Sequence, residues 1–214
     1  MKLTLTLLTA LCLLTAFVTA QKEKWQKIFN GKDFTGWTIR GEKVLNDYRI
    51  ENGEIVGVSK PGSQNTFLCT NKDYSDFILE LDVKVDTAMN SGIQIRSHSR
   101  PDFKNGRVHG YQIEIDPSAR AWSGGIYDEA RRGWLADLTK NPAGQKAFNK
   151  YGWNKYRIEA NGSMLSVSVN GVPTASIRDT VDASGFIALQ VHGTKVERPM
   201  EVRWRSIRLM EIGR

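Results

Sequence analysis

Hydrophobic and polar residues alternate along most of the chain with a period of two, and the periodicity of helices is almost absent. Alternate side chains of a strand leave on opposite faces, so each alternating run predicts a strand with one buried face. The clearest run is 77–85, where Phe77 and every second residue to Val85 are apolar. Further apolar positions of this kind are Ile93, Ile95, Tyr156, Ile158, Ala160, Leu165, Val167, Val169, Ile187, Leu189 and Val191. Near the end of the chain the phase changes between Trp204 and Ile207, which predicts a bulge near Ser206.

Short turns separate these runs. Asn-Gly pairs at 52–53 and 161–162 stand between alternating segments and predict tight hairpins. Strands joined by such turns, without long helices between them, predict an antiparallel sandwich.

The segment from Asp128 to Tyr151 breaks this rhythm and is expected to be a long insertion, with one helical turn near Gln145–Asn149. Its Trp134 and the neighbouring Arg131 and Arg132 favour a functional loop.

Residues 1–20 have the features of a secretory signal, since Lys2 precedes an apolar run that ends in the small residues Val18-Thr-Ala20. We expect cleavage there, a single domain over 21–214, and export to the periplasm or the outside of the cell. Only Cys69 would remain in the exported chain, so its core is expected to hold without an internal disulfide. No other stretch is long and apolar enough to predict a membrane span.

The chain is basic, with a formal net charge of +7. Its lysines and arginines are scattered, often at every second position of a predicted strand, which is typical of a solvated sheet face. Because a nucleic-acid site would gather them, we expect no nucleic-acid partner, and the sequence does not indicate an oligomeric state.

The predicted strand at 110–116 has one apolar face, suited to the core, and one face that carries an amide and two carboxylates. In this run, GYQIEID, Tyr111, Ile113 and Ile115 alternate with Gln112, Glu114 and Asp116. Successive carboxylates on one strand face lie about 7 Å apart. They can divide acid and base roles, hold sugar hydroxyls, or simply face water.

Two other predicted strands carry similar polar faces, one with Gln94 and Arg96 and the other with Gln190 and His192. Amide, guanidinium and carboxylate groups are suited to bind sugar hydroxyls, because they present paired hydrogen-bond donors or acceptors. If these strands are neighbours, their polar side chains converge. The alternative is a solvated sheet face with cross-strand pairs such as Arg96 with Glu114.

Motifs for other chemistries are absent from the sequence. His98, His109 and His192 do not have zinc-ligand spacing, and there is no phosphate-binding loop or nucleophile elbow. We therefore predict no metal or cofactor, and a structural ion in the sandwich stays open.

An ordered series of motifs resembles the bacterial 3-keto-disaccharide hydrolase family, formerly known as a domain of unknown function. The series comprises FNGKDFTGW (29–37), DFILE (76–80), NSGIQIR (90–96), GYQIEID (110–116), GGIY (124–127), WN (153–154), NG (170–171) and GFIALQVHG (185–193). The segment 128–134 and the segment 202–207 match less well. The resemblance implies a concanavalin A-like jelly-roll sandwich with sugar chemistry on its concave face.

For a 3-keto glycoside, the ketone acidifies the hydrogen at C2, and the resulting enolate can expel the group at C1 before water adds. Glu114 or Asp116 is the candidate base, Arg96 the candidate partner of the enolate, and His192 the candidate proton donor. The candidate substrate-binding residues carry amide or aromatic side chains: Asn90, Gln94, Gln112, Tyr127, Trp134 and Gln190.

Three alternatives stay open at this stage. One is an inverting glycosidase that uses Glu114 and Asp116, although both would project in parallel from one strand. Another is a lectin-like module that binds glycan on the same face without turnover, and the third is a purely structural surface domain.

Overall fold

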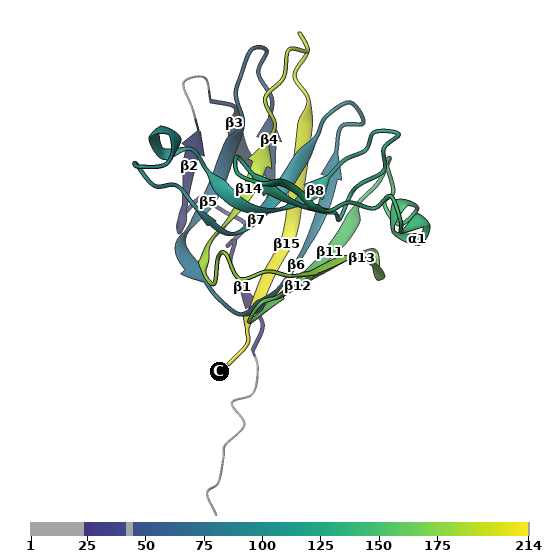
Figure 1. Cartoon of the computed structure of the whole chain (residues 1–214). Coiled ribbons are helices and arrows are strands. Elements are labelled where there is room, and N and C mark those ends of the chain that lie inside the picture. The colour runs from purple at the N-terminus through teal and green to yellow at the C-terminus, as the bar shows by residue number, and fades with distance from the viewer. Residues whose placement is uncertain (1–23, 42–44, 214) are drawn as a thin grey trace, which may run out of the picture.

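The computed structural model describes residues 24–41 and 45–213, so the predicted signal at 1–20 lies outside them. The described elements are nearly all β-strands, arranged as two antiparallel sheets that pack against each other (Figure 1). The predicted all-β sandwich is confirmed. Within the described residues, no helix is long and apolar enough to cross a membrane.

One sheet has eight strands, with β1 paired to β15 at the end where the chain terminates (Figure 1). In spatial order the strands are β13 (Val172–Arg178), β12 (Met164–Val169), β11 (Asn154–Asn161), β6 (Phe77–Val85), β15 (Glu201–Glu211), β4 (Glu54–Val58) and β3 (Asp47–Glu51), with β1 (Gln26–Lys27) beside β15.

The other sheet has seven strands. In spatial order they are β10 (Gly133–Ala136), β9 (Ile126–Glu129), β8 (His109–Ile115), β7 (Ser91–His98), β14 (Gly185–Val191), β5 (Thr66–Tyr74) and β2 (Trp37–Gly41). The three strands with candidate polar faces, β8, β7 and β14, are therefore adjacent, as their convergence requires.

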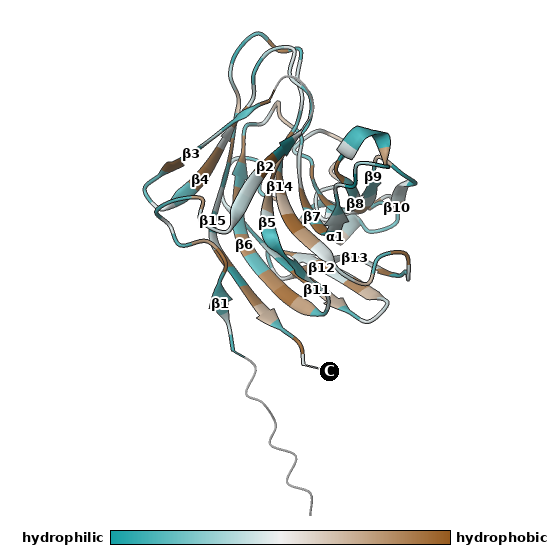
Figure 2. Cartoon of the chain, turned by 90° about the vertical axis from the view of Figure 1, so that its left-hand side faces the viewer, coloured by the Kyte–Doolittle hydropathy of each residue, from teal (hydrophilic) through white to brown (hydrophobic). Residues whose placement is uncertain are grey.

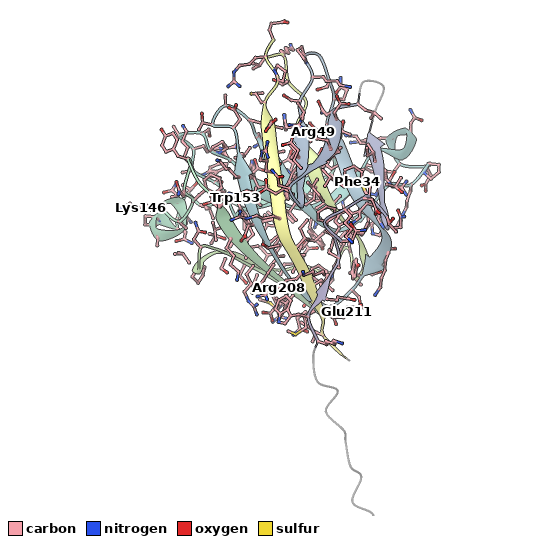
Figure 3. All side chains as sticks on the ribbon, turned by 180° about the vertical axis from the view of Figure 1, so that it is seen from behind. Phe34, Arg49, Lys146, Trp153, Arg208 and Glu211 are labelled. Carbon is pink, nitrogen blue, oxygen red and sulfur yellow. The ribbon has the colours of Figure 1, made fainter. Side chains whose placement is uncertain are left out.

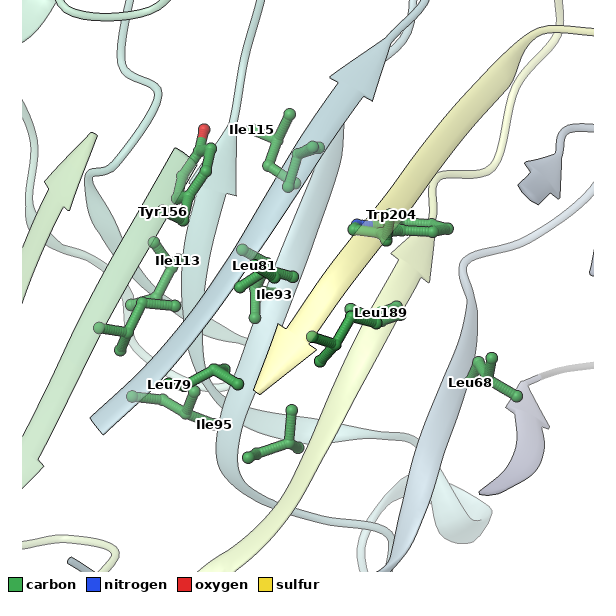
Figure 4. Packing of buried hydrophobic residues seen from close by; sticks show 14 of the residues in the cluster. Leu68, Leu79, Leu81, Ile93, Ile95, Ile113, Ile115, Tyr156, Leu189 and Trp204 are labelled. Carbon is green, nitrogen blue, oxygen red and sulfur yellow. The ribbon is translucent and has the colours of Figure 1, made fainter. Parts of the chain in front are cut away.

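The core lies between the sheets and is built by the apolar positions of the alternating runs (Figure 4). Leu79 and Leu81 from β6 meet Ile93 from β7 and Ile113 from β8, and all four are at most 1 % exposed. Along strands of both sheets, bands of hydrophobic and hydrophilic residues alternate (Figure 2). Burial of these faces supplies the main driving force for folding, about 25 cal/mol for each Å² of apolar surface removed from water.

The predicted turns and bulge are present. Asn52 and Gly53 both have positive φ and join β3 to β4, as a type I′ hairpin requires. At the second predicted hairpin the turn lies one residue later than the Asn-Gly pair: Asn161 ends β11 and pairs with Met164, so Gly162 and Ser163 connect β11 to β12. The pairing of β15 with β6 shifts register between Arg205 and Arg208, and Ser206 has a φ of 55°.

The segment 128–151 contains more structure than expected. It holds the end of β9, all of β10 and the short helix α1 (Pro142–Gln145). Outside this segment, a 3₁₀ turn, η1, occupies Lys104–Gly106 between β7 and β8. The helical turn begins three residues before the predicted one, because the Asn141 side chain accepts a hydrogen bond from the Gly144 N–H and Pro142 is favoured at a helix start.

The outer face of the eight-stranded sheet carries charged side chains that form salt bridges with one another, and β15 runs along the middle of this face (Figure 3). Arg208 and Arg157 both bond to Glu80, and the Arg205 guanidinium lies 3.9 Å from the ring centre of Trp153. A cavity of about 640 Å³ opens there, lined by charged side chains that include Glu80, Lys155 and Arg205. Since its carboxylates are already bonded to neighbouring cations, we place the candidate site elsewhere.

Candidate active site on the seven-stranded sheet

A cavity of about 330 Å³ lies on the outer face of the seven-stranded sheet. Its lining residues are polar or aromatic and come from the four strands β8, β9, β10 and β14 and from loops next to strands of this sheet: Asn65, Asn90, Arg107, Gln112, Glu114, Arg120, Tyr127, Glu129, Trp134, Gln190 and His192. The cavity thus brings together seven of the candidate residues from the sequence.

Glu114 lines this cavity and is 4 % exposed. Its Oε1 accepts hydrogen bonds from Asn90 Nδ2 at 2.6 Å and from Arg120 at 3.3 Å, and its Oε2 accepts one from Gln112 Nε2 at 3.0 Å. Burial raises the pKa of Glu114, against the opposing influence of Asn90, Gln112 and Arg120. A fixed carboxylate with a raised pKa is suited to proton transfer.

A buried chain of hydrogen bonds orients Gln112 toward Glu114. The Ser97 hydroxyl donates to Gln94 Oε1 at 2.7 Å, and Gln94 Nε2 donates to Gln112 Oε1 at 2.7 Å. The Gln112 amide is thereby left with its NH₂ group facing Glu114. Gln94 is 0 % exposed and does not line the cavity, so its contribution is to hold Gln112.

Gly92, which pairs with Glu114 across β7 and β8, leaves room for the Gln112 side chain. A Cβ at this position would lie 2.4 Å from Gln112 Cδ. We expect Gly92→Ala to push the Gln112 amide off Glu114 and to lower kcat/KM about tenfold, the value of one charge-assisted hydrogen bond. Steady-state kinetics check this, with Gly213→Ala as the control because no atom lies within 4 Å of a Cβ there. Equal kinetics in both variants would show that the Gln112 position is unimportant.

Asp116 is not among the residues that line the cavity. Its Oδ2 accepts a hydrogen bond from Arg120 Nε at 2.8 Å, and its Oδ1 accepts one from the Ser118 N–H. Burial alone would raise the pKa of Asp116, but the bonds from Ser118 and Arg120 outweigh it and hold that pKa below its ordinary value. Asp116 therefore anchors Arg120, whose guanidinium also lies 5.1 Å from the ring centre of Trp134.

Arg96 is not in the cavity, contrary to the sequence-based expectation. It has a φ of 45° within a bulge between Ile95 and His98, so its side chain leaves the alternation that Gln94 follows. The guanidinium is 1 % exposed; it donates to Asp76 Oδ1 at 2.8 Å and to the backbone oxygens of Ser75 and Gly162. The expected pair of Arg96 with Glu114 is also wrong, because Gly92 is the residue opposite Glu114.

The hairpin of β9 and β10 forms the aromatic wall of the site. Tyr127 and Trp134 are cross-strand partners with ring centres 5.2 Å apart. The turn of the hairpin is held by ion pairs, because Arg131 bridges Asp128 and Asp182 while Arg132 bridges Asp128 and Asp179. The two arginines predicted to be functional thus fix the hairpin and do not line the cavity.

Gln190 and His192 reach the cavity from the other side, on and just after β14. Gln190 is 0 % exposed, and neither atom of its side-chain amide has a hydrogen-bond partner among the described residues. His192 Nδ1 lies 2.6 Å from the Gly193 carbonyl oxygen. Buried amides are normally hydrogen-bonded, so the Gln190 amide beside this cavity is suited to hold a polar ligand.

Four lining residues were not predicted from the sequence: Asn65, Arg107, Arg120 and Glu129. Glu129 lies two residues after Tyr127, so the strand alternation would have placed both side chains on the same face. Arg120 follows Asp116 by four residues in a loop, and Asn65 and Arg107 precede strands, where no local pattern indicates the direction of a side chain. Within the described residues, no group of three or more His, Cys, Asp or Glu side chains is arranged to hold a metal ion.

A family model described as the 3-keto-alpha-glucoside-1,2-lyase-like domain matches residues 24–210. Among curated proteins there is no match.

Solved structures share the fold at low sequence identity. A candidate glycosyl hydrolase from Parabacteroides distasonis ATCC 8503 is 19 % identical with a TM-score of 0.62, over 88 % of this chain and 94 % of that one. The carbohydrate-binding module CBM66 from Bacillus subtilis is 16 % identical with a TM-score of 0.60, over 81 % and 94 %. A Bacillus subtilis protein of unknown function with a galectin-like fold is 12 % identical with a TM-score of 0.64, over 88 % and 94 %. These similarities confirm the predicted jelly-roll class.

Proposed function

The chain belongs to the family of 3-keto-α-glucoside-1,2-lyase-like domains, and from this premise we propose that it cleaves 3-keto glycosides or disaccharides in the cavity of the seven-stranded sheet. A carbohydrate-active role accords with the family and with the fold. The observation that carries the specific proposal is the buried Glu114 carboxylate in a cavity whose Gln190 amide has no partner among the described residues.

The reaction begins with removal of the C2 proton, which the neighbouring C3 ketone acidifies. Glu114 is the proposed base, because it lines the cavity and burial raises its pKa, whereas Asp116 is committed to Arg120. The enolate then expels the group at C1 and leaves a C1–C2 double bond, the elimination that a 1,2-lyase performs. If water adds to that bond, the overall result is hydrolysis.

The negative charge on the ketone oxygen requires a fixed cation or donor. Arg96 cannot serve, because its guanidinium is buried on Asp76 and backbone oxygens. Arg120 takes this role in the proposal, since it lines the cavity, contacts Glu114 and is held by Asp116 and by stacking near Trp134. The reaction also needs a proton donor at the leaving oxygen. His192 is the candidate donor from the sequence, and it lines the cavity.

The remaining lining residues suit sugar binding. Tyr127 and Trp134 offer ring faces and edges for the apolar side of a pyranose, and Asn90, Gln112 and Gln190 offer amide donors and acceptors. Export of the protein, proposed from residues 1–20, would bring the site to sugars outside the cytoplasm.

The proposal is tested by incubating the chain lacking residues 1–20 with a 3-keto disaccharide and with its unoxidised parent, and by following product release chromatographically. We expect cleavage of the 3-keto compound alone, because only its ketone acidifies the C2 hydrogen. Saturable binding of either sugar without any product would identify a lectin-like module instead, and cleavage of the parent sugar would support a conventional glycosidase.

Replacing Gln190 by leucine is expected to raise KM about tenfold without lowering the Tm. The apolar side chain removes a buried amide that has no partner in the described part of the chain, which is neutral or stabilising, but it also removes hydrogen bonds to substrate, each worth about 1 kcal/mol. Kinetics and thermal unfolding measure the two effects, and the exposed Gln26→Leu serves as the matched control. An unchanged KM would exclude Gln190 from substrate binding.

A further inference from the structure

The cavity contains a second buried carboxyl group, Glu129, to which no role has been assigned. Glu129 ends β9 and is 6 % exposed. In the register of β8 and β9, Tyr127 is opposite Gln112 and Glu129 is opposite Gly110. Glu129 therefore shares the outer face with Gln112 and Glu114, and it lines the cavity with them.

The surroundings of Glu129 differ from those of Glu114. An Arg107 guanidinium nitrogen lies 3.5 Å from Glu129 Oε1, and Asn65 and His192 are its other polar neighbours. Glu114, by contrast, accepts three hydrogen bonds, the shortest at 2.6 Å. Shorter donated hydrogen bonds favour the ionised form, so this geometry suits Glu114 to act as the ionised base and Glu129 to act as the acid.

Burial also raises the pKa of Glu129, against the influence of Arg107, His192 and Asn65. Burial has the same effect on Glu114, so the hydrogen-bond geometry is what distinguishes the two carboxyl groups. A protonated carboxyl group beside the leaving oxygen can deliver its proton to it.

The structure weakens the sequence-based prediction that His192 donates this proton. A carbonyl oxygen only accepts hydrogen bonds, so the 2.6 Å contact with Gly193 requires that Nδ1 carries a hydrogen. In the neutral ring Nε2 then has a lone pair and no proton. The contact with Gly193 thus occupies the Nδ1 hydrogen, and in this tautomer Nε2 is an acceptor toward the cavity.

We propose that Glu129 is the general acid of the site, the residue that protonates the oxygen leaving C1, and this inference rests on the proposed function. Glu114 takes the proton from C2, and the electron pair of that C–H bond forms the enolate. The enolate electrons then form the C1–C2 double bond as the C1–O bond breaks, and the leaving oxygen takes the proton of Glu129. The glycoside becomes an unsaturated ketone and an alcohol; Glu114 ends protonated, Glu129 ends ionised, and proton exchange with solvent restores both.

The role of an acid is tested by the dependence of the rate on the leaving group. Wild type, Glu129→Gln and Glu114→Gln are compared on a 3-keto disaccharide and on 4-nitrophenyl 3-keto-glucoside, whose phenolate departs without protonation. We expect Glu129→Gln to lower kcat on the disaccharide about 10²–10³-fold and on the aryl substrate less than tenfold. Glu114→Gln should slow both substrates alike, since removal of the C2 proton precedes both departures.

Each result has one meaning. An equal loss on both substrates in Glu129→Gln, with wild-type turnover intact, would overturn the inference and leave the proposed function standing. Failure of the wild type to cleave either substrate would overturn the proposed function, and the inference with it. Glu51→Gln, on the outer face of the other sheet, is the matched control and should match the wild type, and circular dichroism verifies that Glu129→Gln is folded.

Discussion

Replacement of Glu114 by glutamine is expected to lower turnover of a 3-keto disaccharide about 10²–10⁴-fold, because an amide cannot take the C2 proton. The fold should persist, since glutamine has the same shape. One oxygen of the carboxylate becomes an NH₂ group that meets the Gln112 amide donor, and this mismatch should cost about 1–3 kcal/mol. Product release and urea unfolding measure the two effects. Full activity would remove Glu114 from the mechanism.

The pH profile gives an independent measurement on the same residue. The base must be ionised to act, and burial raises the pKa of Glu114 above the ordinary 4.5 of glutamate. In the wild type kcat/KM should therefore rise with pH through a value above 4.5, and at lower pH the carboxyl is protonated and inactive. The residual activity of Glu114→Gln should lack this acid limb. An unchanged limb in the variant would assign it to another group.

Replacement of Arg96 by leucine is expected to cost about 3–5 kcal/mol of stability and to leave turnover per folded molecule close to that of the wild type. The change removes the cation bonded to the buried Asp76 and the donors to the oxygens of Ser75 and Gly162. For a chain of this length, such a loss lowers the Tm by about 10 °C or more.

The control for this variant is Arg205→Leu on the outer sheet face, where the guanidinium is 3.4 Å from Asp82 and the side chain is 41 % exposed. An exposed pair of this kind contributes about 0–1 kcal/mol, so its Tm should change little. If Arg96→Leu folded with an unchanged Tm and lost its turnover, the original assignment of Arg96 to catalysis would be restored. The milder Asp76→Asn, which keeps a similar shape, provides the same comparison should Arg96→Leu fail to fold.

Much of the site was predictable wherever the strand alternation continues. Gln112 and Glu114 lie on the face that the sequence assigns to them, and β8, β7 and β14 are neighbours, as convergence of their polar faces requires. The same reasoning failed at Arg96, because one residue with positive φ ends the alternation. It failed at Asp116 for a different reason: the side chain follows the end of β8 and turns to the loop residues Ser118 and Arg120.

By itself the sequence determined which residues form strands, which face of each strand is buried and where several hairpins turn. These properties are local, since a period of two and an Asn-Gly pair act over a few residues. Only the tertiary structure decided that Arg120, Arg107 and Asn65 would join Glu114 in one cavity. Strand order, bulges and loop paths bring these residues together from distant parts of the chain, and they depend on how the whole sandwich packs.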